Sequence, residues 1–206
     1  MKKYLTKADK FRNKISPEYG AFLQQKYRKQ QWKKKGKQKV IDTLPYRLSE
    51  KFKNYNFSKL QKKKISSLYI YSKEPGTGKT VASAYYYVDF IKQLYLQHSS
   101  FTKTYHFILY SKLMEDLQKD YKDSTNVMKQ YMECDLLVID DFGTKKLTDY
   151  VYDRIYLIIN ERYMSMLPTI INSNFSLEEI GKQLDDGRVI RRIDEDYEII
   201  EKNPYK

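Results

Sequence analysis

Short apolar runs alternate with longer helical stretches through the last two thirds of the chain. The apolar runs predict strands at residues 65–72, 104–110, 135–139, 169–171 and 197–200. Helices are predicted at about 81–96, 111–133, 148–166 and 186–193, and capping-box spacing after Ser176 predicts one more. Strands alternating with helices indicate an α/β fold, a three-layer sandwich around a mainly parallel five-stranded sheet.

The beginning of the chain lacks this alternation. Residues 11–27 could form a short helix, although their apolar spacing is irregular. Leu44-Pro45 predicts an extended step, because the residue before a proline avoids helical angles. We therefore expect an N-terminal arm over residues 1–44, helical or disordered, and a body over residues 45–206.

Charge separates the arm from the body. Residues 1–64 contain 21 Lys or Arg against 4 Asp or Glu, whereas residues 65–206 contain 18 against 22. In residues 24–39 the cations alternate with Tyr27 and Trp32, which suits a nucleic-acid backbone and its bases. An acidic protein partner or plain solvation explains the same charges. Lysine outnumbers arginine 31 to 8, which favours non-specific attraction to phosphate over reading of base edges.

The cysteine count and the lack of long apolar stretches exclude several classes of protein. The single cysteine, Cys134, excludes an intramolecular disulfide and a four-cysteine zinc site. No apolar stretch approaches the roughly 18 residues of a membrane span, and the basic start leads into no apolar secretion signal. We expect a cytoplasmic protein.

The loop after the first predicted strand carries the strongest chemical signal. Its candidate phosphate-binding residues are Pro75, Gly76, Thr77, Gly78, Lys79, Thr80 and Val81. Glycines let backbone N–H groups turn toward an anion, and the following helix adds its N-terminal dipole. In such a P-loop, Lys79 reaches the β- and γ-phosphates and the Thr80 hydroxyl ligates Mg²⁺. The full pattern has glycine at position 73, where this chain has Lys73.

An acidic pair follows the third predicted strand. Asp140 and Asp141 are expected at the carboxyl edge of the sheet, beside the phosphate loop. We expect Asp140 to hold the water shell of the metal ion, and Asp141 to orient or deprotonate the attacking water. A solvated acid pair at a strand end is the alternative.

Later polar residues could complete this site. Asn174, at the tip of the fourth strand, could hydrogen-bond the γ-phosphate or the lytic water, or simply form a turn. Arg188 and Arg192 are four residues apart and share a helix face. An arginine there could stabilise transition-state charge at the γ-phosphate of a neighbouring subunit, or the face could be solvated.

Together these residues resemble a known family. The phosphate loop, Leu-Leu-Val-Ile-Asp-Asp at 136–141, Ser-Asn-Phe-Ser-Leu-Glu-Glu at 173–179 and Arg-Val-Ile-Arg-Arg-Ile at 188–193 are similar to the AAA+ replicative-helicase loaders of the DnaC/DnaI type. Transposition helper ATPases of the IstB type share this core. The resemblance covers roughly residues 45–201. It implies a P-loop AAA+ ATPase that uses ATP and Mg²⁺. The implied roles are Walker A for Lys79 and Thr80, Walker B for Asp140 and Asp141, sensor 1 for Asn174, and an arginine finger across a self-association interface for Arg192.

The resemblance also implies partners. A loader binds a hexameric replicative DNA helicase and places it on single-stranded DNA, and on this resemblance Lys119, Tyr121 and Lys122 are candidate DNA contacts. The alternatives are an IstB-like helper that acts on duplex DNA with a transposase, and a non-hydrolysing adaptor. Asp141 stands where many AAA+ enzymes have glutamate, which implies slow hydrolysis. Only 13 residues follow Ile193, so we expect no helical lid domain.

Overall fold

The computed structural model describes residues 17–32, 36–45, 48–50, 66–98, 104–123, 126–144, 148–184 and 187–201. The chain divides into two compact units, one of residues 1–56 and 88–101 and the other of residues 57–87 and 102–206. The division falls inside one helix, α5 (Lys79–His98). The predicted boundary at residue 44 stays a prediction. Among the helices of the described ranges, none combines the length and apolar character that a bilayer crossing requires.

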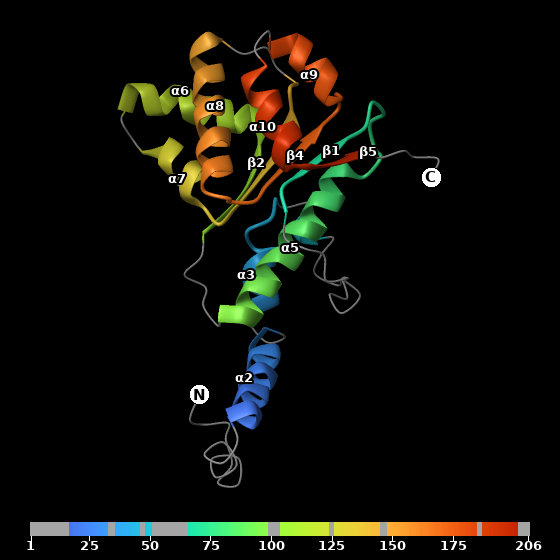
Figure 1. Cartoon of the computed structure of the whole chain (residues 1–206), viewed down its shortest axis with the longest axis vertical. Coiled ribbons are helices and arrows are strands. Elements are labelled where there is room, and N and C mark those ends of the chain that lie inside the picture. Colours follow the sequence, from blue (N-terminus) through green and yellow to red (C-terminus); the bar gives the residue numbers. More distant parts are fainter. Residues whose placement is uncertain are drawn as a thin grey trace. The chain divides into compact units, whose positions relative to one another are not determined.

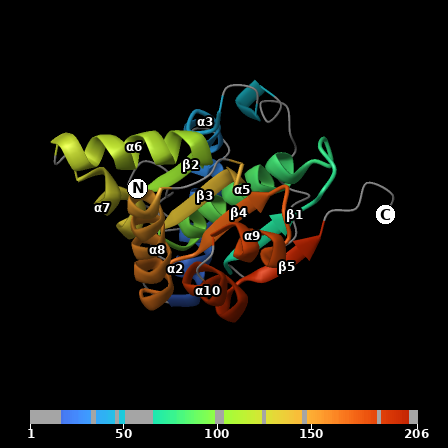
Figure 2. The ribbon, with the colours of Figure 1, turned by 90° about the horizontal axis from the view of Figure 1, so that it is seen from above.

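A five-stranded sheet forms the centre of the larger unit. Its strands are β1 (Leu68–Tyr71), β2 (Tyr105–Leu109), β3 (Leu136–Phe142), β4 (Thr169–Ser173) and β5 (Glu198–Glu201). They lie in the order β2-β3-β4-β1-β5, and every pairing among these described strands is parallel (Figures 1 and 2). The fold class expected from the sequence is therefore confirmed. The order inserts β4 between β1 and β3, so the carboxyl ends of these three strands meet at one edge.

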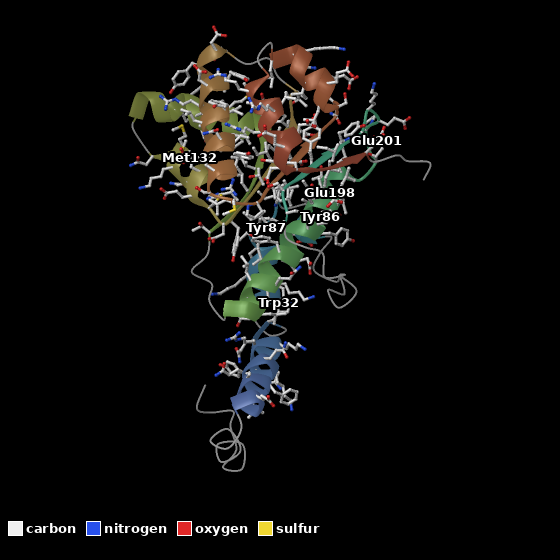
Figure 3. The ribbon with its side chains drawn as sticks, in the orientation of Figure 1. Trp32, Tyr86, Tyr87, Met132, Glu198 and Glu201 are labelled. Atoms are coloured by element: carbon white, nitrogen blue, oxygen red, sulfur yellow. The ribbon has the colours of Figure 1, made fainter. Side chains whose placement is uncertain are left out.

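Helices cover both faces of the sheet. The helices that follow α5 are α6 (Tyr110–Asp123), α7 (Val127–Glu133), α8 (Asp149–Met164), α9 (Leu177–Leu184) and α10 (Arg188–Asp196). Their buried side chains form one apolar cluster with Tyr69, Leu137 and Ile171 of the sheet. On the first half of α5, Tyr87 (labelled in Figure 3) meets the rings of Tyr105 and Phe107 edge-on. The ring centroids lie 6.4 and 5.7 Å from that of Tyr87. Burial on both faces explains why the central strands are continuously apolar.

The helix boundaries follow local signals. At α9 the backbone N–H of Ser176 donates to Glu179 Oε2 at 2.8 Å, and the N–H of Glu179 donates to Ser176 Oγ at 3.2 Å, so the predicted capping box is confirmed. The predicted helical region 111–133 is divided into α6 and α7. Asn126 precedes α7 in a left-handed conformation, φ 57°, which cannot continue a right-handed helix.

The smaller unit contains α2 (Pro17–Gln31), α3 (Lys37–Ile41) and the last turns of α5. Within it, Arg28 Nη1 donates to the carbonyl oxygen of Leu96 at 3.0 Å. The ring of Trp32 (labelled in Figure 3) lies 5.8 Å from that of Tyr95, between centroids. A short helix was predicted over residues 11–27; of that range, residues 11–16 lie outside the described part. Trp32 is only 6% exposed, so its interpretation as a ring available for base stacking is wrong.

Candidate phosphate-binding site

The loop between β1 and α5 has the backbone that an anion site needs. Gly76 and Gly78 have φ of 76° and 84°, in the left-handed region that side chains disfavour. A Cβ on either glycine would meet no atom within 4 Å, so the backbone angle rather than crowding requires glycine. Helix α5 begins directly after Gly78, and the unpaired N–H groups of its first turn favour bound phosphate.

Lys79 is held at this loop by carbonyl groups. Its buried ammonium donates to the carbonyl oxygens of Ser72 and Glu74, each at 3.3 Å. Burial lowers the pKa of Lys79, and the negative charges of Asp141 and Asp140 oppose that shift. Phosphate oxygens are stronger acceptors for an ammonium than neutral carbonyls are. The position therefore suits a lysine that binds phosphate.

Lys73 does not strain the loop. In the described residues the non-glycine positions with positive φ are Asn126, Asp141 and Met166, and Lys73 is not one of them. Its side chain forms an ion pair with Glu179 of α9, with Nζ 2.9 Å from Oε1. The usual glycine is thus not required at this position by the backbone.

Thr80 and Asp140, 60 residues apart in sequence, meet at the carboxyl edge. The Thr80 hydroxyl donates to Asp140 Oδ1 at 3.0 Å. Asp140 is buried, which raises the pKa of its carboxyl, and hydrogen bonds from Asn172 and Thr80 oppose the shift. In the described part of the chain no group of three or more His, Cys, Asp or Glu could hold a metal ion. A hydroxyl and one carboxylate nevertheless fit Mg²⁺, which proteins commonly bind through one or two carboxylates plus substrate phosphates.

Asp141 lies at an irregularity of the sheet. The register between β3 and β4 shifts between Ile139 and Phe142, and Asp141 has φ 59°. The Thr144 hydroxyl donates to the Asp141 carbonyl oxygen at 2.9 Å. A bulge re-aims a side chain relative to its neighbours, and here Asp141 is exposed while Asp140 is buried. Its carboxylate is thus open to solvent at the edge where the phosphate loop lies.

The end of β4 contributes an asparagine that the sequence analysis passed over. Asn174 is half-buried just after the strand, and its predicted role stays a prediction. Asn172 is fully buried and donates from Nδ2 to Asp140 Oδ1 at 2.7 Å. Its carboxamide oxygen accepts from the hydroxyl of buried Ser83 on α5. The available signal was position, because Asn172 is the first polar residue after the apolar run 169–171, at the carboxyl end of the strand.

Two arginines of α10, Arg188 and Arg192, contact α8. The Arg188 guanidinium lies 4.5 Å from the Tyr156 ring centroid, and that of Arg192 lies 4.6 Å from the Tyr163 centroid. Arg192 Nε also donates to Asn160 Oδ1 at 3.1 Å. Residues 188 and 192 therefore share a face, as predicted. A role for Arg192 at a neighbouring subunit stays a prediction.

The candidate DNA contacts lie on α6. Lys119 is exposed there, while the side chains of Tyr121 and Lys122 lie outside the described ones. Their contact with DNA stays a prediction.

Comparison with known proteins agrees with this geometry. A family model described as IstB-like ATP binding protein matches residues 20–193. No curated protein sequence matches the chain significantly.

Solved structures of replication proteins share the fold. The crystal structure of the DnaC helicase loader aligns with a TM-score of 0.55 at 24% identity, covering 73% of this chain and 82% of that one. The crystal structure of DnaI aligns with a TM-score of 0.55 at 20% identity, covering 76% and 82%. AMPPCP-bound DnaA from Aquifex aeolicus aligns with a TM-score of 0.56 at 17% identity, covering 68% and 41%. These alignments agree with a P-loop AAA+ fold.

Proposed function

Because the chain belongs to the family of IstB-like ATP binding proteins, we propose that its P-loop site binds ATP with Mg²⁺ and hydrolyses the ATP. The observation that carries the proposal is the 3.0 Å hydrogen bond between Thr80 and Asp140. It brings a hydroxyl and a carboxylate together at the open side of a glycine loop, where a phosphate-bound cation would lie.

Each residue then has a chemical task. Lys79 would neutralise phosphate charge, and Thr80 and Asp140 would hold the magnesium ion, which would supply charge stabilisation to the phosphates. Asp141, exposed at the same edge, orients or deprotonates the attacking water. Asn174 hydrogen-bonds the γ-phosphate or that water. Arg192 stabilises the transition-state charge at the γ-phosphate bound by a neighbouring subunit.

We further propose that this ATPase is a loader for a hexameric replicative DNA helicase on single-stranded DNA. The motif order of the sequence and the likeness in fold to the DnaC helicase loader support this proposal. The basic N-terminal residues offer charge for DNA or for an acidic partner surface. The likeness at 24% identity concerns the fold. The partner is therefore to be identified by experiment.

The family match favours a second candidate equally. IstB-like proteins give the family its description, and a transposition helper would use the same ATP site with duplex DNA and a transposase. The two candidates differ in partner and in DNA form. A loader binds single-stranded DNA and the helicase, whereas the transposition helper binds duplex DNA and the transposase.

Calorimetric titration of ATP with Mg²⁺ tests the common part of both candidates. We expect the full chain to bind, and Lys79→Ala to weaken binding by about tenfold or more, because hydrogen bonds to charged groups contribute about 1.5–3 kcal/mol. Lys129→Ala, which removes an exposed lysine of α7, is the matched control and should bind normally. Absence of binding by the full chain would refute the proposed ATP site.

Capture of partners separates the candidates. The full chain, with ATP and DNA, is incubated with the replicative helicase of its host or with a transposase encoded nearby. A stable complex with the helicase that needs single-stranded DNA supports the loader. A complex with the transposase on duplex DNA supports the helper and refutes the loader.

A further inference from the structure

A buried network of hydrogen-bonded polar side chains follows the phosphate loop and joins three elements, α5, β4 and β3. Ser83 on α5, Asn172 on β4 and Asp140 on β3 are 0%, 0% and 4% exposed. The Ser83 hydroxyl donates to the carboxamide oxygen of Asn172, and Asn172 Nδ2 donates to Asp140 Oδ1 at 2.7 Å. Polar groups buried this completely are destabilising unless they are hydrogen-bonded. The hydrogen bonds among these three side chains therefore stabilise their burial.

Chemistry decides the direction of the carboxamide of Asn172. An ionised carboxylate only accepts hydrogen bonds, so the amide nitrogen must face Asp140. The amide oxygen then faces Ser83, which can donate. Ser83 is also tied to the P-loop, because its hydroxyl lies 3.2 Å from the carbonyl oxygen of Lys79, one helical turn earlier. Ser83 therefore orients Asn172, and Asn172 orients the carboxylate.

The carboxylate so held is the one that meets the phosphate loop. Asp140 Oδ1 accepts from both Asn172 and Thr80, at 2.7 and 3.0 Å. The hydrogen bond from Asn172 is the shorter of the two, and Asn172 lies on the neighbouring strand. Strand pairing fixes its backbone, since Asn172 lies opposite Ile70 of β1 in the parallel ladder. A rigid donor of this kind can hold Asp140 in one rotamer while the Thr80 hydroxyl exchanges partners.

We propose that Asn172 is a positioning residue of the nucleotide site, which holds Asp140 against Thr80 and so sets how strongly Mg²⁺ enhances nucleotide binding. The proposal rests on the proposed ATP site and adds to it two residues outside the P-loop and β3, Asn172 and its orienting partner Ser83. Asn172 acts through Asp140.

The test measures equilibrium binding of a fluorescent ATP analogue by the full chain with Mg²⁺ and again with EDTA. The ratio of the two affinities is the magnesium enhancement. Asn172→Ala should lower this ratio by about tenfold, because it removes a hydrogen bond to a charged group, while affinity in EDTA changes by less than about threefold. Ser83→Ala should lower the ratio by a smaller factor. In the Asn172→Ala background it should lower the ratio no further, since Ser83 acts through Asn172.

Ser67→Ala is the matched control. Ser67 is also buried, and its hydroxyl accepts from the N–H of Thr169 at 3.3 Å at the opposite end of the sheet. It should leave the magnesium enhancement unchanged. If Asn172→Ala does not fold, as judged by its melting transition, Ser83→Ala against Ser67→Ala decides the question.

The outcomes separate the two proposals. Failure of the wild-type chain to bind the analogue in either solution refutes the ATP site itself. Normal wild-type binding with an unchanged magnesium enhancement in folded Asn172→Ala, or in Ser83→Ala where that variant decides, overturns the role of Asn172 and leaves the ATP site standing. A loss of affinity equal in Mg²⁺ and EDTA also overturns it, because it would mark a general structural defect.

Discussion

Lys73 Nζ lies 2.9 Å from Glu179 Oε1, so the first position of the phosphate loop is ion-paired with the first turn of α9. The other oxygen of Glu179 accepts from the N–H of Ser176 at 2.8 Å and closes the capping box. The hydrogen bond from Ser176 and then that from Lys73 lower the pKa of Glu179 to about 2. One carboxylate thus connects the P-loop to the helix that follows β4.

This pair predicts acid sensitivity. Because the pKa of Glu179 in the folded chain lies below its ordinary 4.5, its charge stabilises the fold above about pH 4.5, and that contribution is lost as pH falls toward 2. Glu179→Gln should therefore show a smaller fall in urea midpoint between pH 5 and pH 3 than the wild type does. Lys73→Ala should show an intermediate fall, since Ser176 remains. Equal falls in all three proteins would contradict the prediction.

Buried Arg162 predicts a large effect on stability. Its guanidinium donates to the carbonyl oxygens of Tyr131, Cys134 and Pro168 at 2.9, 2.7 and 2.7 Å, with no exposed surface. Arg162→Met should lower the free energy of unfolding by about 2–4 kcal/mol, because it leaves these buried acceptors unpaired. Urea denaturation measures the change. Arg191→Met, at an exposed position of α10, should change it by less than about 0.5 kcal/mol.

Replacement of Arg192 should affect ATP binding and ATP hydrolysis differently. Arg192 contacts Asn160, Tyr163 and Glu195 of its own chain. On the proposed role of Arg192 at a neighbouring subunit, Arg192→Ala should keep ATP affinity within about twofold while losing hydrolysis stimulated by assembly, for which an arginine finger contributes about 10³-fold or more. Arg191→Ala is the control and should keep both. A large fall in the ATP affinity of Arg192→Ala would argue against action across an interface.

Salt dependence tests the basic N-terminal residues. Deleting residues 1–40 would remove buried Trp32 and Val40, so neutralising exposed lysines is the cleaner change. Replacing Lys26 and Lys29 of α2 by glutamine should reduce the slope of log affinity for single-stranded DNA against log salt by about 1.4, if each lysine neutralises one phosphate. Fluorescence anisotropy at several salt concentrations measures this slope. Lys182→Gln, at an exposed position of α9, is the control and should leave the slope unchanged. An unchanged slope in the Lys26 and Lys29 variant would favour a protein-docking or solvated surface.

The sequence by itself determined the features that depend on local chemistry. Apolar runs identified all five described strands, capping-box spacing identified the start of α9, and glycine spacing identified the P-loop. Such signals need only neighbouring residues, since periodicity, end-capping and backbone angles are set within a few positions. An apolar strand ending in Asp140 also sufficed to predict its place beside that loop.

Only the tertiary structure decided which distant side chains meet. Insertion of β4 between β1 and β3 brings Asn172 to Asp140 and to Ser83, although Asn174 is the residue that the sequence favoured. Trp32 is likewise buried near Tyr95, although its basic surroundings in the sequence had suggested a ring available for stacking on bases. Strand order and packing depend on contacts between residues far apart in the chain, and local patterns of charge and hydrophobicity do not specify those partners.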